Sequence, residues 1–396
     1  MRSLARYVAV AAPLILAPLV SAPGAFADEE RRAVPVAVTQ APGVPIPGSY
    51  IITLKRDAEA PAFVSRVPQL GKAQFTYGTV LSGFAATLTD AQLSFVRSSP
   101  LVTAVEQNAQ ATASGSGARK REATDLWGQD RIDQRNLPLD KQFTTAGNGA
   151  GVKAYVLDTG IDYGHAEFGG RASFGFDAVG DGRNGADCNG HGTHVSGTVA
   201  GNTYGVARKA TLVSVRVLGC DGTGSYAGII AGIDWVAKNA VKPAVMNLSL
   251  GGGKSAAVNA AVDAVSATGL LPVVAAGNSA VDACGISPAS AASALTVGAT
   301  NPRDEETNFS NWGPCLSVYA PGQGILSAKL GGGSIAHDGT SMASPHVAGV
   351  AALYLAANPK ASAYDVGTWI RNAATEDVIK AIAGSSPNRL LFTDGA

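Results

Sequence analysis

Short apolar runs alternate with longer alanine-rich or amphipathic stretches over most of the chain, which predicts strands that alternate with helices. The predicted strands are Val152 to Leu157, Thr211 to Val217, Ala244 to Leu248, Leu271 to Ala275 and Leu295 to Val297, and the predicted helices are Tyr226 to Lys238, Ala256 to Ala267, Ser341 to Ala357 and Ala363 to Arg371. Continuously apolar strands are typical of a parallel sheet that is buried on both faces. We therefore predict one large α/β domain over residues 127–396, with a doubly wound, mostly parallel sheet and helices on both faces.

Residues 49–112 predict a separate small domain. A strand over Ser49 to Leu54 is followed by a helical stretch near Ala60 to Val67, strand signals over Phe75 to Leu88, a helix after Thr89 and a strand over Leu101 to Glu106. This order is compatible with an α+β unit of the ferredoxin-like type. A Pro-rich tether, residues 28–48, precedes it, and residues 113–126 form a small, polar and basic linker that we expect to be open to proteolysis.

The first 27 residues have the layout of a cleavable export signal. Arg2 and Arg6 precede an apolar run from about Tyr7 to Val20, and Ala25-Phe26-Ala27 offers small residues for cleavage. A membrane anchor is the alternative, but prolines interrupt the run, which is shorter than the roughly 20 apolar residues of a spanning helix. We expect a secreted, extracellular product with no membrane partner.

Charge and cysteine content narrow the function further. Thirty basic residues balance thirty acidic ones without a dense Lys/Arg stripe, so nothing favours a nucleic-acid partner. The four cysteines are Cys188, Cys220, Cys284 and Cys315. An even number in an exported chain favours disulfides over metal ligation, and three pairings are possible on composition alone.

Asp158 directly follows a predicted strand, and polar residues beyond the carboxyl ends of parallel strands commonly form the site of such a sheet. Three other interpretations remain open. Asp-Thr-Gly is also the signature of aspartic proteases, although those need two such segments and this chain has one. A phosphoryl-transfer aspartate would have a second Asp two residues on, where Gly160 stands. The residue can also cap a helix.

An imidazole base must be one of five histidines: His165, His191, His194, His337 and His346. Glycines flank His191 and leave room for a substrate backbone to approach. His191 and His194 can alternatively ligate zinc, but that requires a third ligand with helical spacing and a glutamate base, and neither is nearby in the sequence.

Ser341 opens a predicted helix, so its hydroxyl lies at the positive end of the helix dipole and its backbone N–H can donate to an oxyanion. We expect Pro345 in the first turn, where a missing N–H has no cost. Asn278 lies just past the strand Leu271 to Ala275 and is a suitable second oxyanion donor. A simple N-cap serine and a turn asparagine are the ordinary alternatives.

Together these segments resemble the subtilase family, most closely its proteinase K and aqualysin branch. The similarity runs from about Trp127 to the C-terminus and rests on three motifs in the order Asp, His, Ser: Val156 to Ile161, Gly190 to Val195 and Gly339 to His346. The resemblance implies a subtilisin-like fold and a serine endopeptidase. Ser341 would attack a peptide carbonyl, His191 would transfer the proton, Asp158 would orient the imidazole, and Asn278 would bind the oxyanion. We expect polypeptide substrates and a monomer.

The same resemblance implies the walls that bind substrate. Segments that match the family's walls contain Gly222, Gly224, Tyr226, Ser249, Leu250 and Gly251, and the first specificity pocket is expected at Ala275, Ala276 and Gly277. These walls would bind an extended peptide as an added strand, and the small pocket residues leave room for a large apolar side chain. Turn geometry is the alternative explanation for the glycines.

The resemblance also implies two kinds of structural support. Sequential pairing, as in aqualysin-like members, would join Cys188 to Cys220 and Cys284 to Cys315. Structural Ca²⁺ is expected at oxygen ligands from Asp130, Asp133, Gln134, Asp140 and Gln142. No catalytic metal is expected.

Ser49 to Gln107 resembles the family's inhibitor propeptide, which templates folding and then occupies the substrate cleft with its C-terminal tail. We expect this segment to act as an intramolecular inhibitor, with self-cleavage between about Gln107 and Glu122. The rival hypothesis is a catalytically silent subtilase-fold binding or chaperone module.

Overall fold

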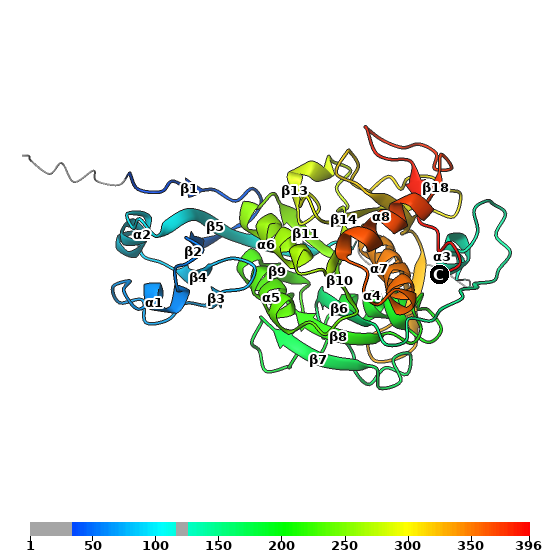
Figure 1. Cartoon of the computed structure of the whole chain (residues 1–396), viewed down its shortest axis with the longest axis horizontal. Coiled ribbons are helices and arrows are strands. Elements are labelled where there is room, and N and C mark those ends of the chain that lie inside the picture. Colours follow the sequence, from blue (N-terminus) through cyan, green and yellow to red (C-terminus); the bar gives the residue numbers. More distant parts are fainter. Residues whose placement is uncertain (1–33, 116–125) are drawn as a thin grey trace, which may run out of the picture. The chain divides into compact units, whose positions relative to one another are not determined.

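The computed structural model describes residues 34–115 and 126–396, and its largest sheet has the order β18-β19-β15-β14-β12-β10-β6-β8-β7 (Figure 1). The strands are β6 (Lys153–Asp158), β7 (Ala172–Asp177), β8 (Thr211–Arg216), β10 (Ala244–Leu248), β12 (Leu271–Ala275), β14 (Leu295–Thr300), β15 (Val318–Pro321), β18 (Thr375–Glu376) and β19 (Arg389–Leu390). The β18–β19 pair is antiparallel and the other neighbouring pairs are parallel. The predicted mostly parallel sheet is confirmed.

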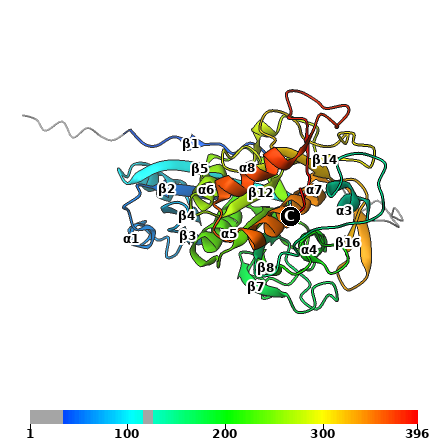
Figure 2. The same ribbon diagram turned by 45° about the vertical axis from the view of Figure 1, so that its right-hand side comes forward.

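Helices cover both faces of this sheet (Figure 1, Figure 2). Helices α4 (His191–Ala200), α7 (Thr340–Ala357) and α8 (Ala363–Ala373) share one buried apolar cluster with the strands. Helices α5 (Tyr226–Asn239) and α6 (Ala256–Ala267) share the other. Neighbouring residues of β10 enter different clusters, Val245 the first and Met246 the second, because successive side chains point to opposite faces. Burial on both faces accounts for the continuously apolar strands.

The N-terminal domain has the order β2 (Pro45–Leu54), α1 (Ala60–Val64), β3 (Phe75–Tyr77), β4 (Gly83–Thr87), α2 (Asp90–Arg97) and β5 (Val102–Ala113). Its antiparallel sheet runs β5-β2-β4-β3, which is the ferredoxin-like arrangement predicted from sequence. Helix α2 starts where expected, because the Thr89 hydroxyl accepts from Gln92 N (3.3 Å) and the Gln92 side chain accepts from Thr89 N (2.9 Å).

Several boundaries differ from the prediction. Strand β5 continues to Ala113 rather than ending at Glu106, because its last residues pair with β9 (Thr223–Ser225) and β11 (Leu250–Gly253). Part of the predicted tether is strand, since β2 begins at Pro45 and β1 (Val38–Thr39) pairs with β5. The predicted set also lacked α4, β7, β15, β18 and β19 of the large domain. Further elements outside it are α3 (Trp127–Ile132), the 3₁₀ turn Ala283–Gly285, β13 (Ile286–Ser287), β16 (Ile325–Ala328) and β17 (Ser334–His337).

Two disulfide bonds join Cys188 to Cys220 and Cys284 to Cys315, which is the sequential pairing implied by the family resemblance. They span separations of 32 and 31 residues. A loop of this length nominally stabilises the fold by about 3–4 kcal/mol. Within the described ranges, no helix is both long and apolar enough to cross a bilayer. The predicted export signal lies outside the described residues.

Candidate active site

Asp158 and His191 meet at the carboxyl edge of the large sheet. Asp158 is the last residue of β6, and His191 is the first residue of α4 after Gly190, whose φ of 107° favours glycine. The His191 Nδ1 atom lies 2.8 Å from Asp158 Oδ1. Because a carboxylate only accepts, Nδ1 carries the proton, and Nε2 is left as a basic nitrogen with no hydrogen-bond partner among the described residues.

Asp187 fixes both of these residues, and the sequence analysis did not select it. Its buried carboxylate accepts five hydrogen bonds: from Thr159 Oγ1, Asn189 N, Gly190 N, Thr193 N and Thr193 Oγ1. Thr159 follows Asp158, and the other donors surround the start of α4. The sequence did contain a signal for this residue: an Asp lies four positions before a histidine at the start of a helix. Carboxylates at such places commonly accept hydrogen bonds from backbone N–H groups.

The charges near His191 change its affinity for a proton. Burial of the imidazole lowers the pKa of His191, whereas the charge of Asp158, the hydrogen bond to that carboxylate and the charge of Asp187 raise it. The net pKa lies above the usual value for histidine. The two carboxylates therefore stabilise the imidazolium.

The neighbouring histidines serve the fold. His194 Nε2 lies 3.0 Å from the Ile325 carbonyl and 3.1 Å from the Ile335 carbonyl, so it donates a proton and is not a metal ligand. His346 Nδ1 lies 2.8 Å from the Met342 carbonyl, and burial lowers the pKa of His346 to about 4. These contacts do not support the zinc interpretation of the His191/His194 pair.

Ser341 lies at the start of α7, with its hydroxyl donating to the Ser249 carbonyl at 2.9 Å. The expectation for Pro345 was wrong, because the helix begins at Thr340 and the proline lies inside it rather than in its first turn. The missing Pro345 N–H leaves the Ser341 carbonyl without its usual helical donor. The Ser249 hydroxyl supplies one instead, at 2.9 Å.

Two donors converge on the carbonyl oxygen of Ser114. One is the Asn278 side-chain amide, through a short hydrogen bond, and the other is Ser341 N at 3.3 Å. The Asn278 Oδ1 atom accepts from Thr340 N (2.9 Å) and Thr340 Oγ1 (2.8 Å), which fixes the orientation of the amide. These two donors are the pair that the sequence analysis assigned to an oxyanion.

The residues before Ser114 lie as a strand between two edges of the large domain. Residues 110–112 of β5 pair with β9, and Thr112 and Ala113 pair with β11. Ala113 N donates to the Gly222 carbonyl (3.0 Å), and Ser114 N donates to the Ser249 carbonyl (3.1 Å). The backbones of the predicted wall residues Gly222, Gly224, Ser249, Leu250 and Gly251 thus all contact this segment.

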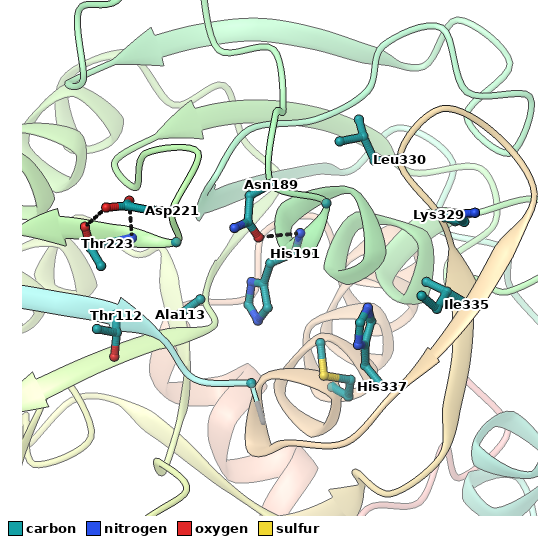
Figure 3. Close-up of a pocket in the computed structure, with 14 residues that line it drawn as sticks. Thr112, Ala113, Asn189, His191, Asp221, Thr223, Lys329, Leu330, Ile335 and His337 are labelled. Carbon is teal, nitrogen blue, oxygen red and sulfur yellow. Dashed lines mark hydrogen bonds between the residues drawn. The ribbon is translucent and has the colours of Figure 1, made fainter. Parts of the chain in front are cut away.

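Two cavities flank the segment. One of about 620 Å³ lies beside His191 and is lined by residues that the sequence analysis had not assigned to the site: Asn189, Lys329, Leu330, Ile335, His337 and Met342 (Figure 3). The other, of about 360 Å³, lies beside Ser114 and includes Gly251, Gly277, Ile286 and Asn311. Ala275, Ala276 and Tyr226 do not line either cavity. The Tyr226 hydroxyl instead donates to the Gly253 carbonyl at 2.5 Å and supports β11.

Comparison with known families agrees with this geometry. The subtilase family model matches residues 149–392. The chain belongs to the subtilase family. Residues 49–114 match the peptidase inhibitor I9 family, so this subtilase is a serine protease with an inhibitor-type propeptide.

Individual relatives give the same result. The subtilase is 44% identical over 405 residues to an extracellular serine proteinase of Thermus sp. (strain Rt41A), with 96% of this chain and 97% of that protein covered. It is also 48% identical to alkaline serine exoprotease A of Vibrio alginolyticus over 314 residues. The aligned region covers 79% of this chain and 59% of that protein. A crystal structure of a cold-adapted subtilisin-like serine proteinase superposes with a TM-score of 0.67 at 48% identity, covering 68% of this chain and 99% of that one.

The residues expected to bind calcium come together in and after α3. Backbone N–H groups hold the three carboxylates: Lys141 N donates to Asp130 (2.9 Å), Thr144 N to Asp133 (2.6 Å) and Gln142 N to Asp140 (2.9 Å). The Gln134 side chain accepts from Asp140 N at 3.1 Å. In residues 34–115 and 126–396, no group of three carboxylate, imidazole or thiol side chains has a geometry that could hold a metal ion.

The electrostatics of this cluster nevertheless suit a cation. Burial and the charge of Asp140 raise the pKa of Asp130, and burial with the charges of Asp140 and Asp130 raises the pKa of Asp133, although backbone N–H groups oppose both shifts. The Asp130 Oδ1 atom is buried and has no hydrogen-bond partner in the part of the chain that the structure describes. Clustered carboxylate and amide oxygens are the ligand type that Ca²⁺ prefers.

Proposed function

We propose that this subtilase is a secreted endopeptidase that hydrolyses peptide bonds through an acyl-enzyme, with Ser341 as nucleophile, His191 as general base and acid, and Asp158 as the residue that orients the imidazole. The observation that carries the proposal is the placement of one peptide carbonyl. Asn278 and Ser341 N both donate to the Ser114 carbonyl oxygen, while the His191 imidazole, held by Asp158 at 2.8 Å, lies next to Gly115.

In the proposed first step, the Ser341 hydroxyl would exchange its present partner for the His191 imidazole. The Ser341 hydroxyl donates to the Ser249 carbonyl, and the His191 Nε2 atom has no hydrogen-bond partner among the described residues. The hydroxyl would donate to Nε2, which would take its proton as the oxygen adds to the carbonyl carbon. Removal of one oxyanion donor typically costs about 10²- to 10³-fold in turnover, so Asn278 would carry a large part of the catalysis.

The propeptide would act as an intramolecular inhibitor that the enzyme itself releases. Its tail pairs with both β9 and β11 as an added β-strand between them. An extended polypeptide substrate would bind in the same way. We propose the domain order predicted above: an export signal over residues 1–27, a tether, the propeptide, a processing region and the peptidase domain. Calcium would be held by Asp130, Asp133, Gln134, Asp140 and Gln142, where it would neutralise the clustered carboxylates and fix the loop after α3.

Casein hydrolysis by the wild type and the Ser341→Ala variant tests the proposal. We expect Ser341→Ala to accumulate as uncleaved precursor without activity. The exposed Ser334 on β17 provides the matched control, and Ser334→Ala should mature and hydrolyse casein normally. Normal maturation and activity of Ser341→Ala would favour the silent binding module instead.

A further inference from the structure

We infer that the peptide bond between Ser114 and Gly115 is the first bond cut during maturation. This assignment rests on the proposed self-processing and adds the identity of the bond, which the sequence analysis left anywhere between about Gln107 and Glu122. Of the tail carbonyls, the one of Ser114 accepts from both Asn278 and Ser341 N. Both donors point at the oxygen on which negative charge develops when the carbonyl carbon is attacked.

The strand register fixes which carbonyl reaches these donors. Ser114 is held through its own N–H by the Ser249 carbonyl, and Ala113 is held by the Gly222 carbonyl on the opposite edge. Since β5 is paired on both edges up to this point, a slip by one residue would break both sets of hydrogen bonds and turn every side chain to the other face. The register therefore delivers the Ser114 carbonyl and no neighbouring one.

The leaving group lies on the histidine side of the bond. A Cβ atom at Gly115 would stand 3.2 Å from His191 Cδ2 and 3.3 Å from His191 Nε2, so the Gly115 backbone is close to the imidazole. It is also close to Gly339, where a Cβ atom would stand 2.8 Å from the Ser114 oxygen and 3.2 Å from Gly115 Cα. The bond thus lies between the imidazole and the start of α7, and a glycine after it allows this close approach.

The chemistry at this bond balances with water as the one co-reactant. The Ser341 oxygen adds to the Ser114 carbonyl carbon while its proton passes to His191 Nε2. The C–N bond to Gly115 then breaks, and the same proton passes to the Gly115 amine. Water next adds to the acyl carbon and gives one proton to His191, which returns it to the Ser341 oxygen as the ester breaks. The products are a propeptide that ends in the Ser114 carboxylate and a chain that begins at Gly115.

The composition of the site favours this bond over one in the basic stretch Arg119-Lys120-Arg121, whose structure lies outside the described residues. A protease that cuts after arginine or lysine needs an acidic group in the pocket that receives that side chain. Among the described residues, the lining of the cavity beside Ser114 contains small, amide and apolar residues, such as Gly251, Gly277, Ile286 and Asn311, and no carboxylate. The match to the inhibitor family also ends at residue 114.

Cell-free translation of the full precursor tests the assignment without a host protease. Samples quenched at the earliest times give the first propeptide fragment, whose mass identifies its C-terminus. We expect it to end at Ser114 and its partner chain to begin at Gly115. A first fragment that ends at any other residue, for example Arg121, overturns the assignment. A wild type that stays uncleaved overturns self-processing as well. If the Ser341→Ala precursor is still cut after Ser114, self-processing fails while the bond assignment is supported.

A second variant tests the bond by its leaving group. In Gly115→Pro the ring would be forced against His191 and the scissile amide would be tertiary, so we expect cleavage after Ser114 to slow by about 10²-fold or more, as for a misplaced reacting group. Gly117→Pro is the matched control and should be processed at the wild-type rate. Because position 115 lies at the end of the paired tail, the melting temperature of the uncleaved precursor checks that the fold is retained. Unchanged processing of Gly115→Pro would overturn the assignment.

Discussion

The carboxylate of Glu106, on propeptide strand β5, accepts a short hydrogen bond from the hydroxyl of Ser255, the N-cap residue of helix α6 in the peptidase domain. It also accepts from Ala257 N at 3.2 Å. Both groups belong to the first turn of α6, where free N–H groups and the helix dipole favour a negative charge. Asn108 makes a similar contact with helix α5, because its side-chain oxygen accepts from Ala227 N at 3.1 Å. The propeptide therefore supplies polar partners to the starts of two helices on the same face of the sheet.

Removal of this charge should weaken the hold of the cleaved propeptide. A hydrogen bond to a charged group contributes about 1.5–3 kcal/mol, so Glu106→Ala should speed release of the propeptide by roughly 10-fold or more. The measurement is the lag before full activity on a fluorogenic peptide after the precursor is processed. Glu59→Ala provides the control, since Glu59 is exposed at the N-cap of α1 and makes no capping hydrogen bond. Equal lags for both variants and the wild type would show that the contact is not used.

The raised pKa of His191 predicts how activity responds to acid. The imidazole must be neutral to act as a base, so kcat/KM should fall as the pH drops through a pKa above the usual 6.5. Asp158→Asn removes the charge that raises this pKa and should move the acid limb to lower pH. It should also reduce kcat on the order of 10⁴-fold, because the asparagine amide can donate to Nδ1 and so favour the wrong imidazole tautomer. An acid limb that stays in place would show that a different group titrates.

Asp187→Asn separates charge from orientation. Asp187 raises the pKa of His191 through charge alone, without a hydrogen bond to the ring. An asparagine keeps one acceptor oxygen for the backbone N–H groups at the start of α4, so we expect a smaller shift of the acid limb to lower pH and a smaller loss of kcat than in Asp158→Asn. The pH profile of kcat/KM is the decisive readout, since a purely structural role would lower activity at every pH and leave the limb unmoved.

Elements that follow from a local sequence pattern could be predicted from the sequence, whereas elements that depend on contacts with distant parts of the chain could not. Strands β6, β10 and β12 were predicted from their apolar runs because all their residues except Lys153 are buried. Helix α4 was not, because its two glycines and its β-branched residues disfavour an isolated helix. Tertiary packing requires a glycine at position 197, because a Cβ atom there would stand 2.4 Å from Ser327 Oγ, which is too close.

The end of β5 was missed for a related reason. Its partners, β9 and β11, come more than a hundred positions later in the chain, so no local pattern marks Ala113 as paired. Pro345 was misplaced because the sequence does not show that the Ser249 hydroxyl replaces the missing backbone donor. The three family motifs contain Asp158, His191 and Ser341, and Asn278 was predicted from its place just past a strand, whereas Asp187 required coordinates.

Calcium removal should destabilise the protein, and more so at higher pH. Asp130 and Asp133 have folded pKa values above that of an ordinary aspartate. Without a cation, ionisation of these groups costs stability, which is lost as the pH rises from about 3.9 through the raised values. Bound calcium requires the ionised forms, so its stabilisation should grow over the same range. With calcium at about 100 times its Kd, a chelator should lower the melting temperature at pH 7 by about 5 °C or more.

Asp130→Asn tests whether the chelator acts at this cluster. The variant keeps an oxygen for Lys141 N but removes the buried charge, so it should lose most of the chelator effect. Asp365→Asn, at the exposed start of α8, should keep the effect. A melting temperature that chelator leaves unchanged in the wild type would count against a structural calcium ion.

The size of the Ser114 side chain predicts how long the cleaved tail stays bound. A serine leaves most of the adjacent cavity of about 360 Å³ empty, although Gly251, Gly277 and Ile286 offer it an apolar lining. Ser114→Leu would bury a side chain worth about 1.5–3 kcal/mol, so the processed propeptide should leave about 10- to 100-fold more slowly and the lag before activity should lengthen accordingly. Gln110→Leu adds the same side chain to an exposed position of the same strand and controls for hydrophobicity alone. Similar lags for the two variants would show that the cavity does not receive the residue at position 114, whereas a long lag for Ser114→Leu alone would identify this small residue as the feature that allows the product to leave.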